Sequence, residues 1–310
     1  MRGGSIRNPP HPFTLLPIRS MKVAVVGPGA IGTVVGAWVA QDAAIELTVC
    51  ARTPVNGLEV ETPAGMMRAS PRVLVHPEAG EAVDWVLVTT KTYDAEGAVR
   101  WLPGLLGPET RIAVLQNGVE HVERFAPWVD AGRITPCVVD IPAERTGPGC
   151  VVQRRAGSIV VPHGEAGEAF VRLFAHTAID VSTTGDFTTR AWRKLAVNCA
   201  GAVSALTLQP AGVAHRRGAA EVMRALVREC VTVGRTVGAR LSDALADEIV
   251  EGYRAGPADS INSLHADRRA GRRMEIDARN GVIVRLGRRA GIPTPVNATV
   301  VALLEACEPG

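Results

Sequence analysis

The sequence has few aromatic residues, little net charge and no paired cysteine motif. Aromatic side chains make up 4% of its 310 residues, and the formal net charge is +3. This near-neutral balance gives no electrostatic case for a nucleic-acid surface. Six cysteines lie far apart in the chain: Cys50, Cys137, Cys150, Cys199, Cys230 and Cys307. Because they show neither a C-x-x-C pair nor a metal-like spacing with histidine, they predict reduced thiols in a cytoplasmic protein and no metal site.

Long hydrophobic runs are also missing. No apolar stretch reaches the roughly 20 residues of a membrane-spanning helix. Residues 1–20 contain no acid, and their longest apolar stretch, Phe13 to Ile18, is interrupted by Thr14 and Pro17. That stretch is too weak for the core of a signal peptide. We therefore expect residues 1–20 to be a disordered extension and Met21 to begin the fold, with Met21 also a candidate start of the natural protein.

What is present, from Met21 onward, is a regular alternation of short apolar runs and helical segments. The composition, 46% hydrophobic and 21% charged, is ample for two domains. Valine-rich runs predict strands buried on both faces: Lys22–Val26, Leu47–Ala51, Trp85–Thr89, Ile112–Leu115 and Thr135–Val139. Between them, Ala30–Gln41 and Asp94–Leu106 have helical character. This order predicts an α/β Rossmann-type domain with a mostly parallel sheet over residues 21–185.

Two hairpins are expected in the same domain. Residues 58–75 predict one that turns at Pro63-Ala64-Gly65, where proline and glycine favour a tight turn. Cys150–Arg154 and Ser158–Val161 predict the other, with its turn at Ala156-Gly157.

Helical periodicity takes over after Gly185. Apolar residues then recur at helical spacing, as in residues 221–238. Further helices are expected in three places: after a cap at Ser242 or Asp243, over Met274–Ala290, and over Asn297–Ala306. Residues 186–310 are therefore expected to form an all-α domain that carries the substrate and catalytic residues.

The run Gly27-Pro28-Gly29-Ala30-Ile31-Gly32 matches the dinucleotide-binding pattern G-x-G-x-x-G. It follows a predicted strand directly and opens the helix that begins at Ala30. The first glycine permits a tight turn, the second lets backbone N–H groups approach a pyrophosphate, and the third, with Gly36, lets helix and strand pack closely. The start of the helix offers unpaired N–H donors to the anion. Glycine loops also serve as simple turns, but this strand–loop–helix context favours cofactor binding.

Arg52 favours NADPH over NADH as the cofactor. An enzyme selective for NADH places Asp or Glu at the end of the second strand, where the carboxylate holds the ribose 2′-hydroxyl. The segment here is Val49-Cys50-Ala51-Arg52-Thr53. A guanidinium can bind a 2′-phosphate, which a carboxylate would repel. The alternative is a solvated arginine in a loop.

Further tracts carry a more specific pattern: Val88-Thr89-Thr90-Lys91, Leu115-Gln116-Asn117-Gly118, Trp192–Cys199, Gly271–Asp277, Asn280-Gly281 and Gly291–Asn297. Together they resemble the ketopantoate reductase family, in the expected order from Met21 to the C-terminus. The tracts around Lys194 and Glu275 are the most specific. The resemblance implies NADPH-dependent reduction of the 2-oxo group of ketopantoate (2-dehydropantoate) to pantoate, a step of pantothenate biosynthesis.

The resemblance also implies roles for single residues. Lys91 matches a lysine near the adenosine phosphate, and Asn117 an asparagine beside the nicotinamide ribose and the substrate. Lys194 matches the catalytic proton donor. Glu275 matches a glutamate that contacts the cofactor ribose and supports the catalytic lysine.

The substrate contacts are implied in the same way. Asn198 matches a substrate contact one helical turn after Lys194, and Ser263 matches a serine that holds the substrate carboxylate. One position departs from the family pattern: Ala202 stands where a second substrate asparagine is usual. The departure leaves the reaction type in place and opens the question of which 2-oxo acid is the substrate.

The residues alone support part of this assignment. Hydride arriving at a ketone carbon leaves an oxyanion, which must be protonated or stabilised. Lys194 and Asn198 can both face such an oxygen, because side chains four residues apart share a helix face. Plainer alternatives stay open: an exposed helix residue for Lys194, a turn before Gly118 for Asn117, an ion pair with Arg279 for Glu275, and a cap for Ser263.

The sequence thus predicts a two-domain reductase of a small 2-oxo acid, a monomer or homodimer, with no nucleic-acid or membrane partner. The site is expected in the cleft between the domains. Rival functions are reduction of another 2-oxo acid, a β-hydroxyacid dehydrogenase, and a redox sensor that binds NADPH without turnover. The dehydrogenases share this domain order but have a cofactor acid where Arg52 stands. The basic run from Arg268 to Arg273 is a solvated helix face or lies near an anionic ligand.

Overall fold

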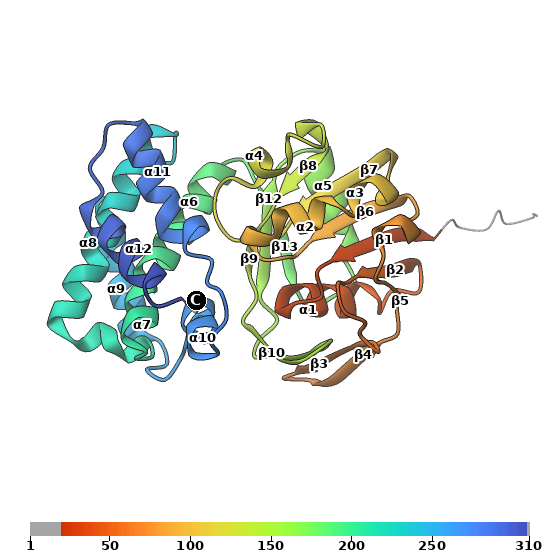
Figure 1. The fold of residues 1–310 in the computed structure, drawn as a ribbon, viewed down its shortest axis with the longest axis horizontal. Coiled ribbons are helices and arrows are strands. Elements are labelled where there is room, and N and C mark those ends of the chain that lie inside the picture. Colours follow the sequence, from red (N-terminus) through yellow and green to blue (C-terminus); the bar gives the residue numbers. More distant parts are fainter. Residues whose placement is uncertain (1–19, 309–310) are drawn as a thin grey trace, which may run out of the picture.

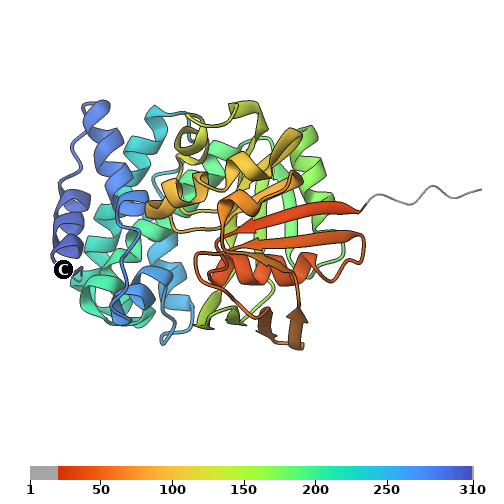
Figure 2. The ribbon, with the colours of Figure 1, turned by 45° about the vertical axis from the view of Figure 1, so that its right-hand side comes forward.

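The structure, a computed structural model, describes residues 20–308. The expected extension, residues 1–20, therefore lies outside the described residues except for Ser20. An α/β part and a helical part lie side by side, the α/β part on the right and the helical part on the left in Figure 1. The turned view in Figure 2 keeps the two parts distinct.

A six-stranded sheet forms the centre of the α/β part. In spatial order its strands are β5 (Arg72–Leu74), β2 (Ile45–Cys50), β1 (Met21–Val26), β6 (Val83–Val88), β7 (Leu106–Val114) and β8 (Ile134–Pro136). Every neighbouring pair is parallel. Val25 and Leu87 are fully buried, as expected where helices or other layers cover both faces of a parallel sheet. The first four predicted strands are confirmed in β1, β2, β6 and β7.

Helices cover the two faces of this sheet. On one face α1 (Ala30–Val39) and α5 (Glu165–Leu173) belong to one apolar core. On the other face, α2 (Ala95–Val99), α3 (Leu102–Leu105) and α4 (His121–Phe125) belong to a second core. The single helix predicted over Asp94–Leu106 is wrong. It breaks into α2 and α3 because Pro103 fits only the first turn of a helix.

Two smaller sheets flank the main one. One has the order β10 (Ala143–Gly147), β11 (Cys150–Gln153), β3 (Leu58–Thr62), β4 (Gly65–Ala69), and the other β13 (Asp180–Thr184), β12 (Ser158–Pro162), β9 (Val138–Asp140). The hairpin β3–β4 confirms the turn predicted at Pro63 to Gly65, although Arg72–Leu74 joins the main sheet as β5. The predicted strand Thr135–Val139 divides between β8 and β9, which belong to different sheets.

The second predicted hairpin is wrong. β11 pairs with β10 and β3, whereas β12 pairs with β9 and β13. The turn that joins two paired strands lies instead at Pro148-Gly149, between β10 and β11. Gly149 and Gly157 both have positive φ angles, +71° and +81°, so local sequence offers two equivalent turns. Only the pairing of the strands decides which turn closes a hairpin.

The helical part follows Gly185 and packs around a third apolar core. Its helices are α6 (Phe187–Ala200), α7 (Ala202–Thr207), α8 (Arg217–Thr236), α9 (Leu245–Ala255), α10 (Ser263–Arg269), a π-helical turn (Asp277–Gly281), α11 (Val282–Arg289) and α12 (Pro295–Glu305). The predicted helices over 221–238 and 297–306 are confirmed as α8 and α12, which end slightly earlier, at Thr236 and Glu305. The one predicted over Met274–Ala290 begins later, with the π-helical turn. Ala244 rather than Ser242 or Asp243 is the cap of α9.

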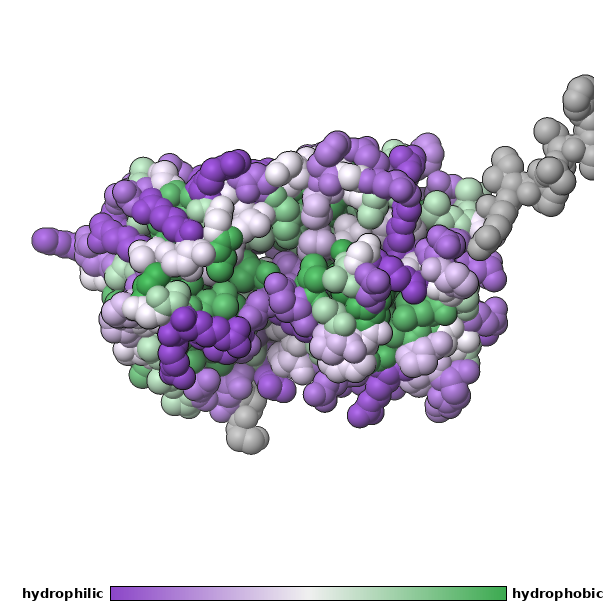
Figure 3. Space-filling view, turned by 90° about the horizontal axis from the view of Figure 1, so that it is seen from above, coloured by the Kyte–Doolittle hydropathy of each residue, from purple (hydrophilic) through white to green (hydrophobic). Residues whose placement is uncertain are grey.

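Polar and aromatic contacts join the two parts. Arg285 of α11 forms a two-pronged ion pair with Glu120, at 2.8 and 2.9 Å, and the Arg273 guanidinium lies 4.5 Å from the ring centre of Tyr93. Seen from above, hydrophobic residues gather in patches on both halves and hydrophilic residues lie along the boundary (Figure 3). No helix within residues 20–308 is both long and apolar enough to cross a membrane.

Candidate active site

The glycine loop lies between β1 and α1, and its geometry fits a pyrophosphate. Gly27 has a φ of +92°, and its carbonyl accepts a hydrogen bond from Thr89 Oγ1 at 2.7 Å. A Cβ on Gly32 would lie 2.3 Å from the Gly27 oxygen, so only glycine fits there. A Cβ on Gly29 would meet nothing within 4 Å, and α1 begins without a side-chain cap. The loop thus leaves open space and unpaired N–H donors for phosphate oxygens.

Arg52 follows β2 at the same carboxyl edge of the sheet. Its side chain is 80% exposed, and its nearest charged partner is Asp94 Oδ2, at 3.5 Å from Nη1. An exposed ion pair of this length contributes little energy. The guanidinium is therefore accessible to a phosphate next to the glycine loop.

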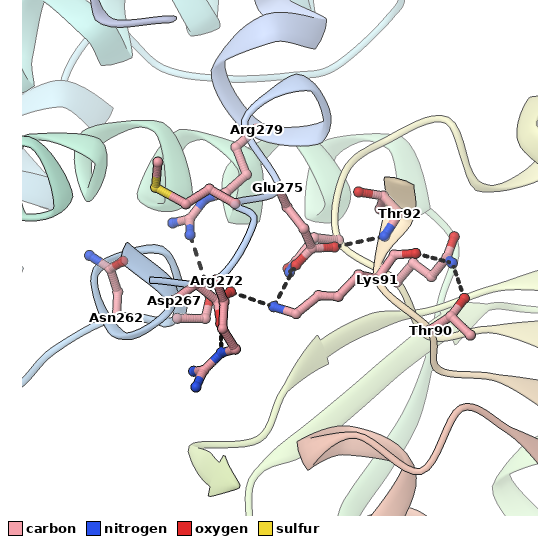
Figure 4. A network of polar contacts seen from close by, with 12 residues as sticks. Thr90, Lys91, Thr92, Asn262, Asp267, Arg272, Glu275 and Arg279 are labelled. Atoms are coloured by element: carbon pink, nitrogen blue, oxygen red, sulfur yellow. Dashed lines mark hydrogen bonds and ion pairs between the residues drawn. The ribbon is translucent and has the colours of Figure 1, made fainter. Parts of the chain in front are cut away.

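Lys91 follows β6 and points across the boundary toward the helical part (Figure 4). Its Nζ lies 2.7 Å from Asp267 Oδ2 of α10 and 3.1 Å from Glu275 Oε2. Burial would lower the pKa of Lys91, but the two carboxylates raise it above its ordinary value. Asp267 was not predicted from the sequence, because nothing in its local pattern marks it as a partner of a lysine so distant in the chain.

Glu275 is 5% exposed, and both of its carboxylate oxygens accept hydrogen bonds. Its Oε1 accepts from the Thr92 N–H at 3.0 Å, and its Oε2 accepts from Asn117 Nδ2 at 3.0 Å as well as from Lys91. Burial would raise the pKa of Glu275, but the charge of Lys91 and these hydrogen bonds hold it below its ordinary value. The alternative partner for Glu275 is wrong: Arg279 forms no ion pair within residues 20–308.

A small pocket joins the end of β7 to α6. It is lined by Gln116, Asn117, Gly118, His121, Cys137, Val138, Val139, Ala191, Lys194, Leu195 and Asn198. Lys194 and Asn198 of α6 thus line the same pocket, as their spacing predicts, and Asn117, which follows β7, lines it as well. Asn198 Nδ2 lies 3.5 Å from Asn117 Oδ1. The pocket brings an ammonium and two amides together beside the carboxyl edge of the sheet.

Asp140, the last residue of β9, holds Lys194 at this pocket. Lys194 Nζ lies 2.8 Å from Asp140 Oδ1, and Arg155 Nη2 lies 2.6 Å from Asp140 Oδ2. Burial would raise the pKa of Asp140, but Lys194 and Arg155 hold it below its ordinary value. The reasoning from sequence missed Asp140. The available signal was an acid directly after the apolar run Val138-Val139.

Ser263 and Ala202 are not among the residues that line this pocket. Ser263 is the exposed first residue of α10, and Asn262 rather than Ser263 caps that helix, accepting from the His265 N–H at 3.1 Å. Ser263 Oγ accepts from Arg279 Nη1 at 3.4 Å. Ala202 is fully buried in the core of the helical part and does not line the pocket.

The residues named so far can hold a dinucleotide and protonate an oxygen. No group of three or more His, Cys, Asp or Glu side chains within the part of the chain that the structure describes is placed to hold a metal ion. The basic run is largely exposed, at Arg269, Arg272 and Arg273, as a solvated face would be. Two of its arginines also have partners: Arg268 donates to the carbonyls of Ala205 and Leu206, and Arg272 pairs with Asp267 at 3.0 Å.

Comparisons with known proteins agree with this arrangement. Residues 23–166 match the family model "Ketopantoate reductase PanE/ApbA", and residues 186–308 match its C-terminal counterpart. A 2-dehydropantoate 2-reductase of Caulobacter vibrioides is 61% identical over 92% of this chain and 98% of its own length. One of Mycobacterium tuberculosis is 38% identical over 93% and 98%. The crystal structure of a PanE/ApbA family ketopantoate reductase from Ralstonia eutropha superposes with a TM-score of 0.84 at 32% identity, covering 93% of this chain and 98% of that one.

Proposed function

Because the chain belongs to the ketopantoate reductase PanE/ApbA family, we propose that it is a 2-dehydropantoate 2-reductase that reduces ketopantoate to pantoate with NADPH. The observation that carries the proposal is the pocket in which Lys194 and Asn198 of α6 face Asn117. This pocket lies at the carboxyl edge of the parallel sheet, where such sheets bind their ligands. The glycine loop opens at the same edge.

The choice of NADPH rests on Arg52. The second strand ends without a carboxylate to hold a ribose 2′-hydroxyl, and the exposed guanidinium supplies a donor set that suits a 2′-phosphate. Gly27, Pro28, Gly29, Ala30, Ile31 and Gly32 supply the phosphate-binding loop. Lys91 and Glu275 lie at the boundary of the two parts, and we assign Lys91 to the adenosine phosphate and Glu275 to the cofactor ribose.

The chemistry supplied with the bound cofactor is a hydride for the C2 carbon of the substrate. Lys194 gives its proton to the ketone oxygen as the carbon–oxygen double bond becomes a single bond, so a neutral hydroxyl forms. Asn117 and Asn198 orient the ketone with their amides. Ser263 donates a hydrogen bond from its hydroxyl to the substrate carboxylate. Glu275 holds Asn117 and Lys91 in place by accepting a hydrogen bond from each. Through Asn117 it supports the pocket that contains the catalytic lysine.

Domain division, assembly and location complete the proposal. We place the boundary between residues 185 and 186, since Asp186 caps α6 by accepting from the Thr189 N–H at 3.2 Å. We propose a monomer or homodimer. The homodimer is supported by a ketopantoate reductase of Staphylococcus aureus with this fold, which is described as dimeric. All six cysteines are free thiols, which supports a reducing, cytoplasmic location.

Steady-state consumption of NADPH by the purified protein tests the function. We expect ketopantoate to be reduced more efficiently than 2-oxo acids without its hydroxyl group, and pantoate to be the product by mass spectrometry. Efficient reduction of another 2-oxo acid, with no turnover of ketopantoate, would show that this other acid is the substrate. Oxidation of β-hydroxyacids as the main activity would favour a β-hydroxyacid dehydrogenase. NADPH binding without turnover of any of these compounds would favour a redox sensor.

A further inference from the structure

We propose that Arg279 selects a carboxylate substrate by placing a buried positive charge behind the hydroxyl of Ser263. The inference rests on the proposed function and deepens it. It assigns to a residue of the π-helical turn the charge that the carboxylate of a 2-oxo acid requires, and it names Ser263 as the group through which that charge acts.

Arg279 is a buried side chain in contact with Ser263. It is 2% exposed, and it comes from the π-helical turn that follows Glu275. Its Nη2 donates to the Asn198 carbonyl at 2.8 Å, and its Nη1 lies 3.4 Å from Ser263 Oγ. Its Nε has no hydrogen-bond partner. Figure 4 shows the side chain descending from its turn toward α10. The guanidinium therefore bridges two residues assigned to the substrate, Asn198 and Ser263.

Arg279 makes no close ion pair within residues 20–308, and the two carboxylates that attract its charge, Glu275 and Asp267, are bonded to other groups. Asp267 gives one oxygen to Lys91 and the other to Arg272. The carboxylate oxygens of Glu275 accept hydrogen bonds from Lys91, Asn117 and the Thr92 N–H. A buried charge without a paired ion destabilises the protein when no ligand is bound. This destabilisation is offset when an anion binds nearby.

The hydrogen-bonding rules of the two side chains direct the Ser263 hydroxyl outward. A guanidinium has only donors, so Ser263 Oγ can only accept from Arg279. The hydroxyl proton of Ser263 is then free to point away from Arg279, and Ser263 is exposed. A carboxylate oxygen at that position accepts a hydrogen bond and gains attraction from the charge behind it. A neutral amide at the same position gains much less of this attraction.

A structural role is the competing explanation. The Asn198 carbonyl lies in the last turn of α6, where a cation stabilises the carboxyl end of a helix. In that case Arg279 would matter for stability and would affect charged and neutral substrates alike. The two explanations differ in one quantity, the preference for a 2-oxo acid over its primary amide.

The experiment compares kcat/KM for ketopantoate and for its primary amide in wild type, Arg279→Gln, Arg279→Met and Arg279→Lys. Glutamine keeps a donor for the Asn198 carbonyl but removes the charge, methionine removes both, and lysine keeps the charge. We expect the glutamine and methionine variants to lose roughly tenfold to a hundredfold of the acid-over-amide preference through KM for the acid, as for a lost charge-assisted hydrogen bond. The lysine variant should retain most of the preference. KM for NADPH should not change.

An unchanged preference in Arg279→Gln, equal losses for acid and amide, or an equal rise of KM for NADPH would each overturn the inference. Should the Arg279 variants fail to fold, Ser263→Ala decides, because Ser263 is exposed and lies at the start of α10. Full acid preference in that variant overturns the inference, because the charge of Arg279 is proposed to act through the Ser263 hydroxyl. If wild type reduces no 2-oxo acid, the proposed function fails. The inference is then tested by thermal unfolding with each ligand. We expect the acid, but not the amide, to raise the Tm of wild type, and we expect Arg279→Gln to abolish this rise.

Discussion

Lys194 of α6 and Asp140 of β9 form an ion pair, with 2.8 Å between Nζ and Oδ1. The pair connects the helical part to the last strand of a small sheet, 54 positions away in the chain. Asp140 stays ionised because Lys194 and Arg155 lower its pKa. The carboxylate therefore holds the ammonium at the wall of the pocket, next to the place where a ketone oxygen would bind.

Removing the ammonium should stop the chemical step and leave cofactor binding intact. We expect Lys194→Ala to lower kcat by at least about 10²-fold, the scale for losing a general acid. The Kd for NADPH, from fluorescence titration, should barely change. Arg193→Ala is the matched control, since Arg193 is exposed and, among residues 20–308, pairs only with Glu248, at 2.8 Å. Near wild-type turnover in Lys194→Ala would remove Lys194 from the mechanism.

Cofactor choice can be measured at Arg52. We expect Arg52→Ala to raise KM for NADPH and to leave KM for NADH nearly unchanged, because only NADPH carries the 2′-phosphate. Arg72→Ala is the control, as Arg72 is another exposed arginine of the α/β part and pairs with Glu81 at 2.7 Å. Steady-state kinetics with both cofactors would contradict the assignment if Arg52→Ala weakened both equally.

Two glycines of the loop should separate folding from binding. Gly29→Ala adds a methyl group into open space, so we expect an unchanged Tm but weaker NADPH binding where the phosphate approaches. Gly32→Ala places Cβ 2.3 Å from the Gly27 oxygen, so we expect a lower Tm or no folded protein. Thermal unfolding and NADPH titration measure both effects. A Gly29→Ala variant with wild-type affinity would argue against a phosphate at this position.

Glu275 should make stability depend on acid pH. Its folded-state pKa lies below the ordinary value, so its contribution is fully present above the unfolded pKa of about 4.3 and is lost as pH falls through the folded pKa. We expect the free energy of unfolding of wild type, from urea denaturation, to fall more steeply below about pH 4.3 than that of Glu275→Gln. Parallel pH profiles for the two proteins would contradict this prediction.

Much of the candidate cofactor site followed from local sequence. The glycine loop is contiguous, and its requirements act on the backbone of the same few residues, so strand, loop and helix were all predictable. The shared wall of Lys194 and Asn198 followed from helix geometry alone. The order of apolar runs also predicted the parallel sheet and the later helices.

The partners of the site residues needed the tertiary structure. Lys91 meets Asp267 across 176 positions of the chain, and Arg279 turns to Ser263 and Asn198 instead of the nearby Glu275. Local sequence likewise did not determine which of two equivalent glycine turns closes a hairpin. The pairing of the strands decides it. The physical reason is common to these cases. A local pattern sets the backbone conformation of a segment, whereas the direction and partner of a polar side chain depend on where the other elements pack and on which charges are already neutralised.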